Sequence, residues 1–289
     1  MIKTAFIGLG VMGYPMAGHI ASAGHDVTVY NRTTAKAKQW VAEHGGSLAL
    51  TPAKAVEGAE VVCACVGNDD DLRSIVEGND GILEGMKKGT IFVDHTTASA
   101  DVAREIAIKA TNRGLKFIDA PVSGGQAGAE NGVLTVMCGG EPRPFQEAKV
   151  IIDCYAQAVT LLGSSGSGQL CKMVNQICIA GLVQGLAEGI NFGERAGLDM
   201  KKVIDVISKG AAQSWQMENR AGTMIEDEFE FGFAVDWMRK DLGICLEEAK
   251  NNGAMLPVTA LVDQFYAAVQ AQGGNRLDTS SLLRNLRKD

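Results

Sequence analysis

The sequence predicts an α/β protein in two parts, a sheet-containing domain over residues 1–162 and an all-helical domain over residues 163–289. Short apolar runs alternate with helical patterns throughout the first part, which is typical of parallel βαβ units with helices on both faces of the sheet. After residue 162 only helical patterns follow. The length of 289 residues suits two such domains.

Each element follows from its own stretch of sequence. Apolar runs predict strands, and these lie at 3–9, 26–30, 61–66, 90–94, 116–120 and 133–138. Helical patterns lie at 11–23, 34–44, from about 70, 99–113 and 144–154, and in the second part at 168–196, 199–208, 234–251, 257–272 and 280–287. The helix over 168–196 would be about 40 Å long, and we expect it to join the two domains.

Composition excludes several classes of protein. Apolar residues make up 46% of the chain and charged residues 21%, which is an ordinary globular balance and not that of a disordered or coiled-coil protein. The net charge of −7, without a basic block, argues against binding to nucleic acid or to an anionic membrane. Polar groups interrupt every window of about 20 residues, so we expect no membrane-spanning helix.

Cysteine and histidine usage argues against a disulfide framework and against a metal site. The seven cysteines are scattered, and the four histidines lack metal-ligand spacing. The chain runs from Met1 directly into a predicted strand, without a secretory signal. We therefore expect reduced thiols, a cytoplasmic location and no metal.

A glycine-rich turn follows the first predicted strand and opens the first predicted helix. The residues are Gly8, Leu9, Gly10, Val11, Met12 and Gly13, a G-x-G-x-x-G pattern. In this context the pattern predicts a dinucleotide site, because the glycines allow a tight turn, a close approach of a pyrophosphate and close helix packing. The helix N-terminus adds free N–H groups for the phosphates. A turn that merely needs glycine is the alternative.

The end of the second predicted strand indicates which dinucleotide binds. An NAD site usually has an acidic residue there, which binds the ribose hydroxyls. This chain instead has Asn31, Arg32 and Thr33. Asn31 does not repel a 2′-phosphate, Arg32 can pair with it, and Thr33 adds a hydroxyl donor. The sequence thus favours NADP(H) over NAD(H), although Arg32 could also be an ordinary solvated arginine.

Three further stretches carry polar groups in suggestive positions. Ser123, Gly124 and Gly125 follow a predicted strand and could expose N–H groups to a carboxylate. Lys172 shares a helix face with Asn175 or Gln176, and Lys240 precedes Asp241 near the start of another helix. Taken separately, these could be a plain turn, a solvated lysine and a surface ion pair of little energetic consequence.

Taken together, these motifs resemble those of the β-hydroxyacid dehydrogenases. This family includes 3-hydroxyisobutyrate dehydrogenase, tartronate semialdehyde reductase and glyoxylate/succinic semialdehyde reductase. The resemblance covers nearly the whole chain, on four ordered stretches: residues 6–13 with Pro15-Met16-Ala17, residues 119–125, residues 166–169 with Lys172, and Lys240-Asp241-Leu242. It implies an N-terminal Rossmann domain, an all-α second domain and a homodimer or homotetramer.

The resemblance also implies residue roles. Lys172 matches the family's general acid/base, which exchanges a proton with the substrate oxygen as hydride moves. The substrate-binding residues by this match are Ser123, Gly124 and Gly125 for the carboxylate, with Asn175 and Gln176. The cofactor contacts by this match are Thr96 near the nicotinamide ribose, Val66, Gly67 and Asn68 in a loop over the cofactor, and Lys240.

One departure bears on the substrate. Several relatives have asparagine four residues after the lysine, where this chain has Gln176. The leading hypothesis is an NADPH-dependent reductase of short carboxylated aldehydes, and the second is an NADP-dependent 3-hydroxyisobutyrate or L-serine dehydrogenase. A non-catalytic NADP(H)-binding module is the remote alternative. For the aromatic stretch 228–233, core packing is favoured over a role in the site.

Overall fold

The computed structural model describes residues 1–287. The chain forms two compact units, and the division between them falls between Lys172 and Met173. This division lies inside the long helix α9 (Ser167–Arg195). The sequence predicted this helix to within a residue at each end.

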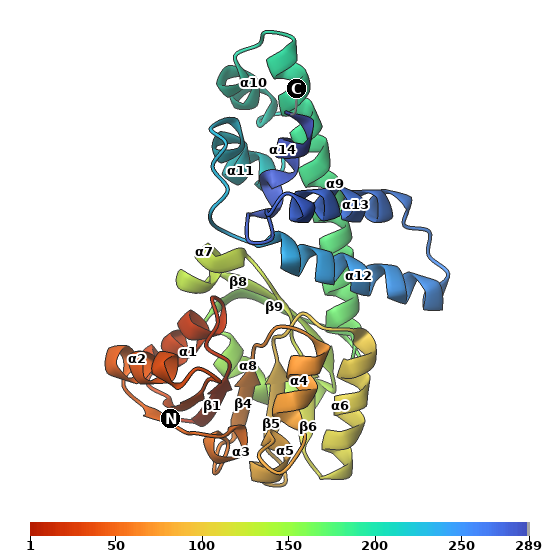
Figure 1. Ribbon diagram of the computed structural model, residues 1–289. Helices are drawn as coiled ribbons and strands as arrows, with labels where there is room; N and C mark the ends of the chain where they lie inside the picture. Colours follow the sequence, from red (N-terminus) through yellow and green to blue (C-terminus); the bar gives the residue numbers. More distant parts are fainter. Residues whose placement is uncertain (288–289) are drawn as a thin grey trace. The chain divides into compact units, whose positions relative to one another are not determined.

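The first unit is built on a nine-stranded sheet in the order β3-β2-β1-β4-β5-β6-β8-β7, with β9 paired to β8 (Figure 1). Its strands are β1 (Lys3–Ile7), β2 (Asp26–Tyr30), β3 (Ser47–Leu48), β4 (Val61–Ala64), β5 (Ile91–Asp94), β6 (Lys116–Asp119), β7 (Val122–Ser123), β8 (Leu134–Gly140) and β9 (Ala156–Gly163). From β3 to β6 all pairs are parallel, as the βαβ pattern predicts.

The far part of the sheet differs from this prediction, because β8 runs antiparallel to β6 and β7. Strands β3, β7 and β9 were not predicted. β3 and β7 have only two residues each, and β9 is largely exposed, so none of them presents a run of buried apolar residues.

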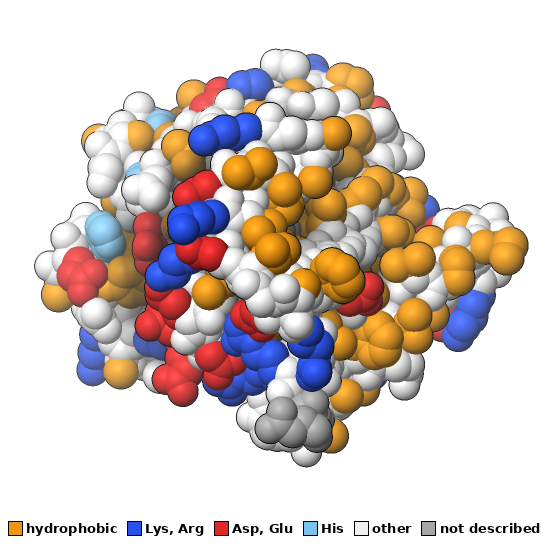
Figure 2. Space-filling view, turned by 90° about the horizontal axis from the view of Figure 1, so that it is seen from above, with side chains coloured by type: hydrophobic (Ala, Val, Ile, Leu, Met, Phe, Trp, Pro, Cys, Tyr) orange, Lys and Arg blue, Asp and Glu red, His pale blue; other side chains and the backbone are white. Residues whose placement is uncertain are grey.

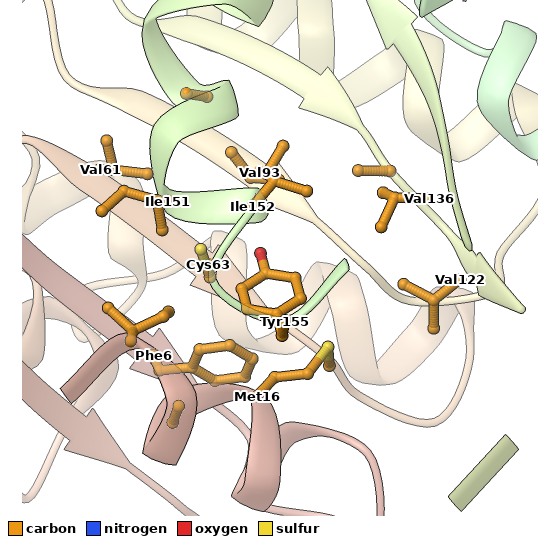
Figure 3. Packing of buried hydrophobic residues seen from close by; sticks show 14 of the residues in the cluster. Phe6, Met16, Val61, Cys63, Val93, Val122, Val136, Ile151, Ile152 and Tyr155 are labelled. Carbon is orange, nitrogen blue, oxygen red and sulfur yellow. The ribbon is translucent and has the colours of Figure 1, made fainter. Parts of the chain in front are cut away.

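Helices cover both faces of the sheet. They are α1 (Gly13–Ser22), α2 (Thr34–His44), α3 (Pro52–Ala55), α4 (Asp69–Val76), α5 (Ile82–Gly85), α6 (Ala100–Asn112), α7 (Gly125–Glu130) and α8 (Pro142–Ile152). Alternate residues of each strand feed opposite faces. Phe6 and Cys63 join a core with α1, α2 and α8, whereas Ile7 and Val62 join a second core with α4 and α6. Figure 3 shows the Tyr155 ring beside Phe6 and Cys63 in the first of these cores.

The second unit is helical. It contains most of α9 together with α10 (Met200–Ile207), α11 (Trp215–Ile225), α12 (Val235–Asn252), α13 (Pro257–Ala271), a 3-10 turn at Thr279–Leu282 and α14 (Leu283–Leu286). Helix α11 was not predicted. Its buried positions, Met217, Ala221 and Met224, have helical spacing but lie in an otherwise polar stretch.

By length and composition alone, helix α9 is long and apolar enough to cross a membrane, a test that core helices of globular proteins also meet. In the structure, apolar residues of α9 pack inside the helical unit. Ala180, Val183, Ala187 and Ile190 are buried and form part of the core of the helical unit. A core helix of a globular domain can be as apolar as a membrane span.

Candidate active site

The glycine turn has three glycines in three different environments. Gly8 has φ +95°, and a Cβ on it would lie 2.3 Å from the carbonyl oxygen of Cys65. A Cβ on Gly13 would lie 2.0 Å from the carbonyl oxygen of Gly8. Gly10 has no such neighbour within 4 Å. The first and third glycines therefore close the turn, and the second leaves open the space that a pyrophosphate needs.

The other residues of this turn differ in exposure. Leu9 is buried in the first core, Met12 is partly buried against it, and Val11 is exposed. The Leu9 N–H donates to Asn31 Oδ1 at 2.9 Å, and Asn31 Nδ2 donates to the Thr33 carbonyl at 3.1 Å. Asn31 thus links the glycine turn to the end of β2.

Arg32 lies beside this link and points into solvent. Its side chain is 87% exposed, and Nη1 lies 3.4 Å from Asp71 Oδ1 at the start of α4. Thr33 is exposed and precedes α2 without capping it through its side chain. No acidic residue occupies positions 31–33, so the guanidinium is the charged group at this strand end.

Two further predicted segments lie against the glycine turn or against each other. A Cβ on Gly8 would also lie 3.2 Å from Val66 Cγ1. The Val66 N–H donates to Thr96 Oγ1 at 3.1 Å, and Thr96 is fully buried. Gly67 follows, and Asn68 caps α4 by accepting the Asp71 N–H at 2.8 Å. The ends of β1, β4 and β5 therefore converge at one edge of the sheet.

The first turn of α9 is fixed to the same edge. Gln169 is fully buried, its Nε2 donates to the Thr96 carbonyl at 2.7 Å, and its Oε1 accepts the Ala98 N–H at 3.1 Å. Asp119, the last residue of β6, accepts the backbone N–H groups of Gly166 and Gln169. Lys172, one turn further along, is only 8% exposed. The solvated-lysine alternative is therefore wrong.

His95 holds the segment that leads to Ser123. Its Nδ1 lies 2.7 Å from the Ala120 carbonyl, and its Nε2 lies 2.7 Å from the Tyr155 hydroxyl. Burial lowers the pKa of His95 to about 4, so the ring is neutral at neutral pH. Because a carbonyl can only accept, the proton is on Nδ1, and Nε2 accepts from Tyr155.

Ser123, Gly124 and Gly125 lie where β7 ends and α7 begins. Ser123 is partly exposed, and both glycines are exposed. Gly124 has φ +133° and Gly125 φ +63°, a backbone that disfavours other residues. The structure thus explains why these two positions are glycine.

The remaining predicted residues belong to the helical unit. Asn175 Nδ2 donates to Gln176 Oε1 at 2.8 Å, and Gln176 Nε2 donates to Asp241 Oδ2 at 2.6 Å. Lys240 Nζ lies 2.9 Å from Asp241 Oδ1, and Asp241 is 3% exposed. The alternative of a surface ion pair is therefore wrong, and Gln176 is a buried partner of Asp241.

Sequence reasoning assigned no role to several of these residues. Asp119, Gln169 and Asp241 stand inside the quoted motifs, but their contacts join positions far apart in the chain. The aromatic stretch is mixed. Phe229 is buried in the helical core as expected, whereas Phe231 is 37% exposed, and the guanidinium carbon of Arg220 lies 5.1 Å from its ring centroid.

Comparison with known proteins identifies the family. Residues 3–163 match the NAD-binding domain of 6-phosphogluconate dehydrogenase, and residues 166–286 match the NAD-binding domain of NADP-dependent 3-hydroxyisobutyrate dehydrogenase. The 2-hydroxy-3-oxopropionate reductase of Escherichia coli is 32% identical over 99% of this chain and 97% of its own length. The chain belongs to the β-hydroxyacid dehydrogenase family.

Other relatives agree with this placement. An uncharacterized oxidoreductase of Shewanella frigidimarina is 65% identical over 100% of this chain and 99% of its own length. The structure of Mycobacterium tuberculosis 3-hydroxyisobutyrate dehydrogenase with L-serine covers 100% of both chains with a TM-score of 0.90 at 29% identity. This β-hydroxyacid dehydrogenase is thus an oxidoreductase of the CH–OH group of a hydroxyacid, with a nicotinamide dinucleotide as cofactor. Residues 1–287 contain no group of three or more His, Cys, Asp or Glu side chains placed to hold a metal ion.

Proposed function

We propose that this β-hydroxyacid dehydrogenase is an NADPH-dependent reductase of short carboxylated aldehydes, such as glyoxylate, succinic semialdehyde or tartronate semialdehyde. One observation carries the proposal. A buried lysine, Lys172, lies one turn beyond the part of α9 that is bonded to Thr96 and Asp119, at the carboxyl ends of β5 and β6. Ligands of open α/β sheets bind at this edge.

The proposed role of Lys172 is proton transfer to and from the substrate oxygen. When bound, the nicotinamide supplies a hydride for reduction or accepts one in oxidation. Protonated Lys172 donates a proton to the carbonyl oxygen during reduction, and neutral Lys172 accepts the hydroxyl proton during oxidation.

The glycine turn and the end of β2 would hold the cofactor. The open space beside Gly10 and the free N–H groups at the start of α1 suit a pyrophosphate. The exposed Arg32 guanidinium can pair with a 2′-phosphate in a forked geometry. Thr96, Gly67 and Lys240 complete the proposed contacts. This arrangement supports NADP(H) over NAD(H).

The substrate carboxylate would be held by Ser123, Gly124 and Gly125, with Asn175 and Gln176 orienting the rest. Names of relatives support a small substrate of this kind. One relative is a reductase of 2-hydroxy-3-oxopropionate, a carboxylated aldehyde. The solved relative with L-serine favours a second candidate, a 3-hydroxyisobutyrate or L-serine dehydrogenase, which would use the same site in the opposite direction.

The test of substrate class is absorbance at 340 nm with NADPH and NADH in parallel. Glyoxylate, succinic semialdehyde and tartronate semialdehyde are tested for reduction, and 3-hydroxyisobutyrate and L-serine for oxidation. We expect NADPH-dependent reduction that is lost in Lys172→Ala. If only the hydroxy acids react, the second candidate is correct. No turnover of any substrate, with NADPH still bound, would refute both.

The test of cofactor preference is Arg32→Asp. Removing the guanidinium and placing a carboxylate beside the 2′ position should reverse the ratio of kcat/KM for NADPH to that for NADH. Lys36→Asp, near the start of α2, makes the same change of charge and serves as the control. An unchanged ratio in Arg32→Asp would show that another group selects the cofactor.

We also propose that the protein is a cytoplasmic homodimer or homotetramer. Apolar side chains gather in patches between charged ones on the face shown in Figure 2. Exposed apolar residues of the helical unit include Val174, Leu182, Phe192, Val258 and Leu261. Patches of this kind often mark subunit interfaces. Light scattering on the purified protein tests the oligomeric state, and a monomer would refute it.

A further inference from the structure

Two buried carboxyl groups lie side by side at the ends of β5 and β6. The strands pair in parallel register with Asp94 opposite Asp119. Both side chains are fully buried. Two carboxylates in such a position cannot both be ionised without a large electrostatic cost.

Their hydrogen bonds are distributed differently over the two carboxyl oxygens. Asp119 Oδ1 accepts the Gly166 N–H at 2.7 Å, and its Oδ2 accepts the Gln169 N–H at 3.0 Å. Thr96 supplies the hydrogen bonds to Asp94, through its side chain and through its N–H, which donates to Oδ1 at 3.0 Å, and Asp94 Oδ2 has no hydrogen-bond partner among residues 1–287. Donors to both oxygens stabilise the ionised form of Asp119. An unpartnered oxygen in the interior disfavours the ionised form of Asp94.

The Asp119 carboxylate fills the space beside two glycines, where no other side chain fits. A Cβ on Gly139 would lie 2.6 Å from Asp119 Oδ1, and a Cβ on Gly168 would lie 2.8 Å from Asp119 Oδ2. Both donors to Asp119 come from the start of α9, where a negative charge also interacts favourably with the helix dipole. Asp119 therefore caps the start of α9 through Gly166, which lies 47 residues later in the chain.

We propose that this pair carries a single negative charge, located on Asp119 with Asp94 protonated, and that Asp119 is a positioning residue which fixes Lys172 by capping α9. The part that concerns Lys172 rests on the proposed function. The charge assignment rests on the two sets of hydrogen bonds alone.

The pKa shifts of the pair and of the titratable groups around it are consistent with a single negative charge on the pair. Burial raises the pKa of Asp94 to about 7 and that of Asp119 to about 6, and the nearby Asp69 at the start of α4 raises the pKa of Asp94 further. The nearby thiol of Cys138 on β8 adds no charge, because burial, with a smaller effect of Asp119, raises its pKa to about 12. His95, next to Asp94, is neutral because burial lowers its pKa to about 4.

The cap is connected to Lys172 by one helical turn. Gln169 donates its backbone N–H to Asp119 and binds the 96–98 segment through its side chain. Lys172 follows three residues later on the same helix. Without the carboxylate, the N–H groups of Gly166 and Gln169 lose their acceptor, and the turn before Lys172 loses its attachment to Asp119.

The test applies one substitution to both carboxyls. Asn is nearly isosteric with Asp and resembles its protonated form, so Asp94→Asn should keep kcat within about three-fold of wild type. Asp119→Asn places an amide against an N–H donor and should lower kcat at least ten-fold. The dissociation constant of NADPH and the KM of the aldehyde should change little, since the loss is in the placement of the proton donor. Asp101→Asn, an exposed carboxylate on α6, serves as the matched control.

Three outcomes would overturn the proposal. Equal losses in both variants would show that the two carboxyls are equivalent. A greater loss in Asp94→Asn would reverse the charge assignment. A fall in NADPH binding and melting temperature of Asp119→Asn without a fall in kcat would show a role in folding alone.

A second measurement requires neither variant to be active nor a known substrate. Carboxyl carbon NMR of wild-type protein with labelled aspartate, assigned by the signal lost in each variant, reports both protonation states directly. At pH 6.5, between the two pKa values, the Asp94 signal should be mainly that of a carboxylic acid and the Asp119 signal mainly that of a carboxylate. The reverse pattern, or two ionised groups, refutes the charge assignment whether or not the proposed function is correct.

Discussion

The two units of this protein hold their polar groups in different ways. In the first unit the groups at the sheet edge are bound mainly to the backbone, as Asn31 is to Leu9 and Asp119 is to the start of α9. In the helical unit Asp278 also binds backbone N–H groups, but other polar side chains bind one another across helices, as Gln176 does with Asp241 and the half-buried Arg239 with Asp263. The first arrangement depends on the path of the chain, whereas the second depends on which helices pack together.

This difference determines which contacts can be predicted from a sequence. A backbone path needs particular residues at fixed local spacing, such as the glycines of a turn. A pair of side chains on separate helices leaves no local pattern, because either partner alone could be an ordinary surface residue.

Gly13→Ala should disrupt the glycine turn itself. The added Cβ would lie 2.0 Å from the Gly8 carbonyl oxygen, so the protein should lose about 1 to 3 kcal/mol of stability and roughly 100-fold in NADPH affinity, about 3 kcal/mol. Urea unfolding and fluorescence titration measure the two effects.

Gly10→Ala is the matched control, since a Cβ there meets no other group within 4 Å. It should weaken NADPH binding and leave the unfolding curve unchanged. A loss of stability in Gly10→Ala equal to that in Gly13→Ala would contradict the distinction between a packing glycine and a ligand-facing glycine.

Asp94 should make stability depend on pH. Its pKa is raised to about 7 in the folded protein, so its stabilising effect is complete below the unfolded pKa near 4 and is lost as the pH rises to about 7. Between these limits wild type should lose up to about 4 kcal/mol relative to Asp94→Asn. Urea unfolding of both proteins at pH 4.5 and 7.5 measures this, and parallel curves would contradict it.

Gln169→Leu should destabilise the first unit through the backbone that its side chain binds. The Thr96 carbonyl and the Ala98 N–H would each lose a buried partner, at a total of about 2 to 4 kcal/mol. Gln184→Leu on the same helix, whose amide binds Glu188 one turn away, should cost far less. Comparable losses of stability in the two variants would show that the bonds to the 96–98 segment contribute no more than a contact within one helix.

Asp71→Asn should have the smallest effect. It removes the carboxylate 3.4 Å from Arg32 Nη1, and it should lower the KM for NADPH by about two- to three-fold without altering that for NADH, since exposed pairs are weak. Asp70→Asn, in the same first turn of α4 but paired with Arg73, should leave both constants unchanged.

Much of the fold was predictable because it follows local patterns. The parallel strands β1, β2, β4, β5 and β6 are buried apolar runs, and α9 has a long amphipathic pattern with a glycine-rich start. The sequence predicted strand β8 but not its antiparallel direction, because the apolar pattern of a strand does not depend on the direction in which it pairs. Helix α11 was missed because its buried positions are few and separated by polar residues.

The candidate site was predictable to a similar extent. The glycine turn, Arg32 and Lys172 stand in motifs with fixed spacing. Asp119 and Gln169 lie within such motifs as well, yet their partners are 47 and 73 residues away. The sequence shows that these residues are polar, but only the folded sheet shows which backbone groups they bind.

The central claim is that Lys172 transfers the proton, and Lys172→Met tests it most directly. Met preserves the length and the packing of the buried stem and removes the amine. With the best aldehyde of the panel, kcat should fall by about 100- to 10,000-fold, while the dissociation constant of NADPH stays within about two-fold of wild type. A Lys172→Met enzyme that retains a third or more of the wild-type kcat would contradict the account.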